Sequence, residues 1–294
     1  MQNIYYFKSN YLIKSKKLKV GETMDYRSWT RIIAPYSNAV EELKIKFKNI
    51  RKDYLEQGQY SPIEFVTGRT KKISSIMAKM KKLNTTNIEE DIEDIAGIRI
   101  MCQFVEDIYA IVEIIKKRAD MRIINEKDYI NNVKKSGYRS YHLIIMYPIE
   151  TIDGPKELQC EVQIRTLAMN FWATIEHSLK YKYDHYIPDE LAKRLKRAAD
   201  AAFRLDQEMG EIREDIIKAQ ELFTEKEYAT TDVYARVDKL KELGDSENYF
   251  YYKHQMDKMS QTNDIAGLID LKAEIDHVLK DVKMSRILDD NEIR

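Results

Sequence analysis

The stretch Leu158–Lys182 constrains the fold most, because a strand pattern with one polar face leads directly into a helix pattern. The apolar positions of the strand part are Leu158, Cys160, Val162 and Ile164, and the polar positions between them are Gln159, Glu161, Gln163 and Arg165. Successive side chains of a strand point to opposite faces, so one face packs in a core and the other carries charges and amides. Two interpretations stay open, a sheet face half exposed to solvent and the floor of a binding site.

A helix is predicted to begin where this strand ends. Thr166 belongs to the residue types that cap the first turn of a helix. Within three turns the helix carries Asn170, Trp172, Glu176 and His177. If the polar strand face is a site floor, this helix forms its wall.

Charge and cysteine usage exclude several classes of protein. Lys and Arg number 49, as do Asp and Glu, so a general electrostatic binder of DNA or membranes is not indicated. Cys102 and Cys160 each lie in an apolar alternating run, as buried thiols do in a reducing cytoplasm, and no zinc-ligand spacing is present. Residues 1–23 are basic without a continuous apolar core, which predicts a poorly ordered extension and neither a signal peptide nor a membrane span. We therefore expect a soluble, cytoplasmic protein.

Hydrophobic periodicity predicts a mixed sheet covered by helices. A long amphipathic helix is predicted from residue 25, with Gly58 and Pro62 ending it and an interruption at Pro35 as an open alternative. Strands are predicted near residues 98–104, 121–125, 141–147 and 158–165, alternating with helices. The fold class is therefore α+β or α/β, with a mixed sheet of about five strands. Beyond Pro188 separate helices are predicted near residues 191–216, 232–243, 246–259 and 264–282.

A cluster of basic residues precedes the first predicted strand. Six cations fall between residues 69 and 82, among them Arg69 and Lys71 beside a turn and Lys79 on a predicted helix. Cations near a helix start suit a polyphosphate, because side-chain donors and the helix dipole converge on it. A solvated, lysine-rich helix face is the alternative.

Two carboxylates have the placement of a metal pair. Asp94 lies at the entry of the strand near residues 98–104, where alone it would be a cap or turn residue, and Glu161 lies on the polar face of the last strand. If the two strands are neighbours, the carboxylates share Mg²⁺ with phosphate oxygens, and the basic cluster together with Arg99 neutralises a nucleoside triphosphate. Such a set serves phosphoryl-type transfer without a nucleophilic Ser or Cys. Glu161 is also placed to act as base toward a hydroxyl acceptor.

One tyrosine lies in a second basic segment. Tyr138 follows Gly137 in a loop that also carries Lys134. A tyrosine in such a loop stacks on a nucleobase in nucleic-acid binders, a contact of ~1–3 kcal/mol. The alternative is an aromatic side chain that packs in the core.

Ordered motifs carry a resemblance to a known family. They are SPIEFVTGR, EDIAGIRIMCQFV, KDYI with KKSGYRSYH, and EVQIRTLAMNFWATIEHSLKYKY. They resemble the synthetase domain of the RelA/SpoT homologues, and within that family the short RelQ-type alarmone synthetases. The resemblance covers about residues 24–218 as a nucleotidyltransferase-like domain. Outside it lie the basic extension of residues 1–23 and a helical C-terminal extension of unknown role, residues 219–294.

The resemblance implies transfer of the β,γ-diphosphate of ATP to the 3′-hydroxyl of GDP or GTP, yielding the stringent-response alarmones ppGpp or pppGpp. By a position-for-position match it implies that Asp94 and Glu161 hold Mg²⁺ and that Glu161 activates the acceptor hydroxyl. The implied ATP contacts are Arg69 and Arg99 at the adenine, and Lys71, Ser75 and Lys79 at the phosphates. The implied acceptor contacts are Tyr138 stacked on guanine, with Lys134, His142, Gln163, Arg165 and Asn170 around it. For His142 and Asn170 a packing or capping role is the alternative.

The match also sets the scope of the expected activity. None of the five histidines precedes an aspartate, so the hydrolase motif of the long bifunctional relatives is missing and alarmone hydrolysis is not expected. The family resemblance implies a homo-oligomer, a homotetramer. Two other functions stay open: a regulatory guanine-nucleotide-binding protein whose helical tail binds a partner, and a synthetase with a non-guanine acceptor.

Overall fold

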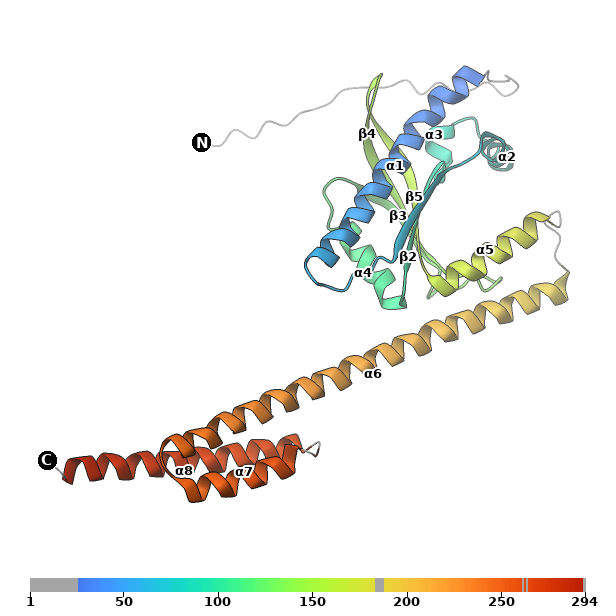
Figure 1. Cartoon of the computed structure of the whole chain (residues 1–294). Helices are drawn as coiled ribbons and strands as arrows, with labels where there is room; N and C mark the ends of the chain where they lie inside the picture. Colours follow the sequence, from blue (N-terminus) through green and yellow to red (C-terminus); the bar gives the residue numbers. More distant parts are fainter. Residues whose placement is uncertain (1–25, 183–187, 261, 263, 293–294) are drawn as a thin grey trace, which may run out of the picture. The chain divides into compact units, whose positions relative to one another are not determined.

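The computed structural model describes residues 26–182, 188–260, 262 and 264–292, and the chain divides between Gly210 and Glu211 into two compact units (Figure 1). The predicted extension of residues 1–23 lies outside the described residues. The elements in chain order are α1 (Tyr26–Glu56), β1 (Phe65–Thr70), α2 (Ile73–Leu83), α3 (Ile88–Asp91), β2 (Ala96–Cys102), α4 (Val105–Lys116), β3 (Arg122–Asp128), β4 (Tyr141–Thr151), β5 (Gly154–Thr166), α5 (Leu167–Lys182), α6 (Asp189–Glu242), α7 (Ser246–Ser260) and α8 (Ile265–Glu292).

One mixed sheet organises the first unit, and the prediction of about five strands is confirmed. The strand order is β1-β2-β5-β4-β3. The strand that opened the sequence analysis, β5, lies at the centre, parallel to β2 and antiparallel to β4. The edge strand β1 was not predicted, because it is short and contributes a single fully buried side chain, Val66, to the core.

The apolar face of the sheet is covered by helices α1 and α4. Leu43 and Phe47 of α1 and Ile108 of α4 are completely buried in one cluster with the apolar side chains of β5. Helix α1 is continuous through Pro35, so no interruption occurs there. Burial of such side chains contributes ~1.5–3 kcal/mol each, and it fixes which face of the sheet is left for a site.

The alternation predicted for β5 is confirmed. Its four apolar side chains are at most 3% exposed, whereas Glu161 and Gln163 lie partly exposed on the opposite face. Arg165 is the exception on the polar face, because its side chain is almost completely buried. The opposite face is therefore polar and partly covered, as a binding site requires.

Helix α6 is longer than predicted. The helices expected near residues 191–216 and 232–243 are one continuous helix of 54 residues. The intervening residues 217–231 contain no Pro or Gly to end it. Within the first unit α6 packs on α5, where Trp172 Nε1 donates a hydrogen bond to the backbone oxygen of Leu195 (2.8 Å). Trp172 therefore joins two helices, and Tyr138 packs against the cluster that contains it.

The second unit has a core of its own. Buried apolar side chains come from the last turns of α6, from α7 and from α8, and include Leu240, Met256, Leu268 and Ile275. The long C-terminal helices that the sequence predicted are thus present. None of the helices in the described ranges combines the length and the hydrophobicity needed to cross a bilayer.

Candidate active site

The strand register brings the predicted site residues into two rows across the polar face. One row contains Arg69 of β1, Gly97 of β2 and Glu161 of β5. The next row contains Arg99, Gln163 and His142. Arg69, Asp94, Arg99, Glu161 and Gln163 line one pocket together. Residues far apart in the sequence thus form one site because the central strands pair in this register.

Glu161 is held in its ionised form at the centre of this face. Its carboxylate lies 2.9 Å from His142 Nδ1 and accepts a hydrogen bond from Gln163 Nε2 (2.8 Å). Burial alone would raise the pKa of Glu161, but the contacts with His142 and Gln163 outweigh it and the net pKa is lowered. The group is therefore a carboxylate at neutral pH, as a metal ligand or a base must be.

Two hydrogen-bonded chains connect Arg165 to the same carboxylate. In one, Arg165 donates to the Tyr138 hydroxyl (2.6 Å), which lies 2.7 Å from His142 Nε2. Since an ionised carboxylate only accepts, His142 Nδ1 carries the proton that faces Glu161. In the other chain, Arg165 donates to Gln163 Oε1 (2.7 Å) and the Gln163 amide donates to Glu161. We call this closed ring of Arg165, Tyr138, His142, Gln163 and Glu161 the acceptor ring.

Asp94 lies on the other side of the pocket and is neutralised by two lysines. Lys71 Nζ and Lys79 Nζ donate to its two carboxylate oxygens at 2.7 and 2.8 Å. Lys71 N also donates to Ile95 O (2.8 Å), which fixes the end of β1 beside the turn that carries Asp94. Burial would raise the pKa of Asp94, but the two ammonium groups outweigh it and lower the pKa. Asp94 is therefore ionised as well.

The two carboxylates fit a divalent cation that also takes ligands from a substrate. They are close enough to interact, because the charge of Asp94 opposes the lowering of the Glu161 pKa by His142 and Gln163. Among the residues that the structure describes, no cluster of three or more His, Cys, Asp or Glu side chains suits a metal ion. Mg²⁺ is commonly held by one or two carboxylates together with substrate phosphates. The donor set thus suits a cation that arrives with a phosphate ligand.

Positive charge accumulates on the β1 side of the pocket. Burial and the charges of Arg165 and Arg69 lower the pKa of Arg99. Arg99 Nε donates to Gln163 Oε1 at 3.3 Å, whereas Arg69 is exposed on its edge strand. Guanidinium groups brought together in this way favour an anionic ligand.

Lys134 lies beside Tyr138. Lys134 Nζ is 4.8 Å from the Tyr138 ring centre, and 4.1 Å from that of Tyr129. Tyr129 also packs edge-to-face on Tyr138 and His142, at centroid distances of 6.0 and 5.2 Å. Sequence reasoning missed Tyr129, although it lies in the KDYI motif and its signal was the same, an aromatic residue within a basic segment.

Two of the predicted site residues, Ser75 and Asn170, belong neither to the acceptor ring nor to the lining of the carboxylate pocket. Ser75 is exposed in the first turn of α2, where its amide donates to Lys72 O (2.9 Å). Asn170 is partly buried in the first turn of α5. His142 is an integral member of the acceptor ring, so the packing alternative weighed for it does not describe its contacts.

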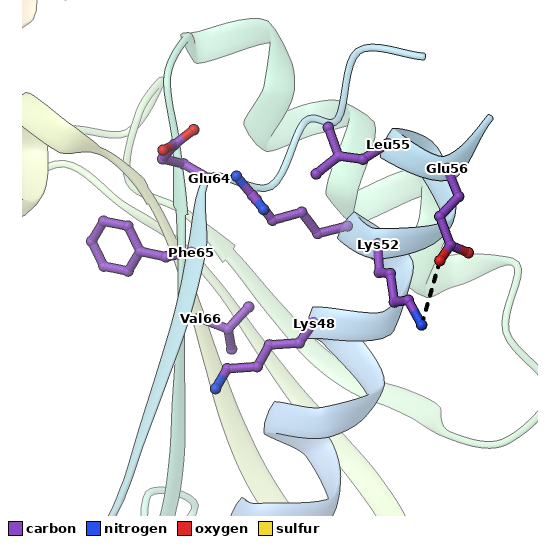
Figure 2. A pocket seen from close by; sticks show the side chains of 8 residues that line it. Lys48, Lys52, Leu55, Glu56, Glu64, Phe65 and Val66 are labelled. Carbon is purple, nitrogen blue, oxygen red and sulfur yellow. Dashed lines mark ion pairs between the residues drawn. The ribbon is translucent and has the colours of Figure 1, made fainter. Parts of the chain in front are cut away.

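A second pocket lies between α1 and β1 and shares no lining residue with the carboxylate pocket (Figure 2). Its volume is about 650 Å³. Lys48, Lys52 and Leu55 line it from α1, and Phe65 and Val66 from β1; Figure 2 shows Lys48 and Val66 between the helix and the strand. Lys52 forms an ion pair with Glu56 (3.4 Å). None of the predicted site residues lines this groove.

Comparisons with known proteins point to one family. Residues 68–186 match the model of the region found in RelA/SpoT proteins. The GTP pyrophosphokinase YjbM of Bacillus subtilis is 52% identical over 204 residues, which are 69% of this chain and 97% of YjbM. A GTP pyrophosphokinase family protein from Streptococcus pneumoniae has a TM-score of 0.64 at 56% identity, covering 67% of this chain and 98% of that chain. Small alarmone synthetase 1 from B. subtilis, bound to its product pppGpp, has a TM-score of 0.63 at 52% identity, covering 65% and 98%. The chain therefore belongs to the RelA/SpoT family.

Proposed function

We propose that the protein is a cytoplasmic (p)ppGpp synthetase that transfers the β,γ-diphosphate of ATP to the 3′-hydroxyl of GDP or GTP. The observation that carries this proposal is the one pocket lined by Asp94, Glu161, Arg69 and Arg99, where the hydrogen-bonded chain through Tyr138 and His142 ends on Glu161. The B. subtilis relatives whose structures contain pppGpp or AMPCPP support guanine and adenine nucleotides as the two ligands.

The donor nucleotide binds on the β1 side in this proposal. Asp94 and Glu161 would hold Mg²⁺, which would draw charge from the transferred phosphates. Lys71 and Lys79 hydrogen-bond Asp94, so their ammonium groups lie beside the place proposed for those phosphates. Arg69 and Arg99 pack beside the adenine, and Ser75 lies at the N-terminus of α2, where the helix dipole favours phosphate.

The acceptor nucleotide binds on the Tyr138 side. Tyr138 stacks on the guanine, with Lys134, Gln163, Arg165 and Asn170 around it, and His142 and Gln163 orient the carboxylate of Glu161. Glu161 takes the proton of the 3′-hydroxyl as the new bond to the β-phosphorus forms and AMP leaves. Its lowered pKa means that Glu161 is ionised at neutral pH, so the carboxylate is free of the proton it has to accept.

Product analysis tests the proposal directly. Purified full-length protein is incubated with ATP, MgCl₂ and either GMP, GDP, GTP or a second adenine nucleotide as acceptor, and products are separated by anion-exchange chromatography. We expect AMP and a 3′-diphosphorylated guanine nucleotide in equal amounts, with loss of both on chelation by EDTA. Binding of both substrates without any such product overturns the proposal, and product from the adenine acceptor alone assigns another acceptor. Added ppGpp should persist, since hydrolysis is not expected.

We also propose that the protein is a homo-oligomer, a tetramer as in its family, assembled through α6. Leu205, Met209, Ile212 and Ile216 follow the 4-3-4 spacing of a coiled-coil seam and are all between 42% and 56% exposed. An unpartnered apolar seam of this length favours association with a second copy. Light scattering after size exclusion tests this: Ile212→Glu with Ile216→Glu should lower the mass, and an unchanged mass contradicts the seam.

A further inference from the structure

Helix α6 touches the loop that carries Tyr138. Gly137 adopts a left-handed backbone conformation with φ +87°, and a Cβ atom at this position would lie 2.7 Å from the Cβ of Ala199. The backbone of the loop therefore rests directly on α6, at a distance that only glycine permits. The neighbouring Tyr138 packs against a small apolar cluster of Trp172, Ala173 and Ala199, which joins α5 to α6.

Arg139 fastens this contact. Its guanidinium donates to Gly137 O (3.2 Å) in its own loop and to Ala199 O (3.5 Å) in α6. It also forms an ion pair with Asp200 (3.1 Å) and lies 4.4 Å from the centre of the Phe203 ring. The Arg139 side chain is only 12% exposed. Burial of a charge in this way is costly, and it persists where several polar and aromatic partners compensate for lost water.

Both chain neighbours of Arg139 contact Arg165 of the acceptor ring. In the chain Arg139 lies between Tyr138 and Ser140. The Tyr138 hydroxyl accepts a hydrogen bond from Arg165 Nη2, and the Ser140 hydroxyl accepts one from Arg165 Nε (3.2 Å). Ser140 is itself completely buried and donates to Ile164 O of β5 (3.2 Å). Displacement of the loop backbone at Arg139 should therefore shift the Tyr138 ring relative to β5, whereas Asp94, Lys71 and Lys79 are held by their own hydrogen bonds on other segments.

We propose that Arg139 is a positioning residue for the acceptor nucleotide and that the segment Ala199–Phe203 of α6 is part of the acceptor side of the site. Arg139 does not touch the substrate in this proposal. Arg139 holds the loop so that the Tyr138 ring stacks on the guanine. The proposal rests on the proposed function, which makes guanine the ligand of Tyr138. Loss of the Arg139 side chain raises the KM for GDP about tenfold or more and leaves the KM for ATP unchanged.

The test compares Arg139→Gln and Arg139→Lys with a matched control on α6, Lys193→Ala, which removes an exposed side chain paired with neighbouring Glu190. We expect Arg139→Gln to weaken GDP binding. Arg139→Lys should restore little of it, because a point charge cannot reach Gly137 O, Ala199 O and Asp200 together. Phe203→Leu and Asp200→Asn should weaken GDP binding less than Arg139→Gln does. The control should match the wild type.

Two measurements separate the outcomes. Steady-state kinetics give KM for each substrate, and calorimetry gives the affinity for GDP without turnover. Equal loss toward ATP and GDP, or unchanged GDP affinity in Arg139→Gln with intact tryptophan fluorescence, overturns the positioning role. If the wild type binds GDP but makes no alarmone, the proposed function fails, and the GDP affinities of the variants still decide the role of Arg139. A wild type that binds no guanine nucleotide overturns both.

Discussion

The two sides of the carboxylate pocket are built differently. On the side proposed to bind ATP, the donor side, Asp94 lies in a turn and is neutralised by ion pairs to Lys71 and Lys79, while Arg69 projects from an edge strand. On the side proposed to bind the acceptor nucleotide, the acceptor side, every member of the ring lies on or beside the central strands, and Arg165 is nearly completely buried. One side is a set of exchangeable charges, and the other is a closed network.

This difference indicates different tasks. Ion pairs in partly exposed positions exchange partners at small cost, so the donor side can release its lysines to arriving phosphates. A closed hydrogen-bonded network anchored on a buried arginine resists such change, and it fixes the direction of each donor before a ligand binds. We therefore expect donor-side substitutions to act on ATP binding and acceptor-ring substitutions to act on orientation of the acceptor.

Glu161 belongs to both sides, so its substitution should have the largest effect. Glu161→Gln keeps the shape of the side chain but removes its negative charge. It thereby removes an oxygen proposed to bind the metal and the proposed general base. We expect turnover to fall by about 10³-fold or more, since a general base alone contributes 10²–10⁴-fold. The initial rate of AMP release measures this.

Tryptophan fluorescence supplies the folding control for that variant. Both tryptophans, Trp29 and Trp172, lie in the first unit and are buried there. A Glu161→Gln protein with the wild-type spectrum and undiminished turnover would remove Glu161 from the metal and base roles.

The donor side is tested next by Lys71→Ala. We expect a loss of about 10²-fold in kcat/KM for ATP, the usual result of removing one charged donor from a transferred group. Lys82→Ala, exposed in the last turn of the same helix that carries Lys79, is the matched control. An equal loss in both variants would mean that general positive charge, not the contact to Asp94, matters.

On the acceptor side, Tyr138→Leu should raise the KM for GDP by about tenfold, because a stacking contact of ~1–3 kcal/mol is lost. Tyr138→Phe keeps the ring but breaks the contacts with Arg165 and His142, and should mainly lower kcat. Kinetics with each substrate varied separately distinguish the two. If Leu and Phe behave alike, the hydroxyl and not the ring carries the effect.

The smallest effect concerns stability. Burial raises the pKa of Asp206 to about 6, although Thr166 donates to it (2.7 Å). The folded state thus binds this proton more tightly than the unfolded state, whose Asp titrates near 3.9. Its contribution to the free energy of unfolding falls as pH rises from about 4 to about 6, by ~1–2 kcal/mol. Urea unfolding followed by tryptophan fluorescence should show Asp206→Asn gaining on the wild type between pH 4 and 7. A constant difference contradicts the raised pKa.

The sequence predicted the centre of the fold and the charged part of the site for a physical reason. Strand β5 alternates strictly, so the face that carries Glu161 follows from period two alone. Asp94 and Lys71 adjoin turns and element ends, which local residue types also reveal. Residue chemistry at such boundaries is local information, and a single sequence contains it.

The remaining features depend on long-range pairing. The placement of His142 between Tyr138 and Glu161 follows from the register of β4 against β5, which no local pattern specifies. Arg139 finds Asp200 across 61 residues, through a helix whose packing is set by Trp172 and Ala199. Likewise the continuity of α6 followed from the absence of helix breakers, but apolar spacing suggested two helices.

The parallel pairing of β2 with β5 also determines when the site can form. Arg99 and Gln163, neighbours across this pairing, are 64 residues apart in the chain. Contacts between distant residues form late, because the entropy of closing the intervening loop is lost before they stabilise anything. During synthesis from the N-terminus the cationic segment and Asp94 exist first, without the base. A nascent chain thus gains catalytic competence only after β5 has left the ribosome and inserted between two strands made before it.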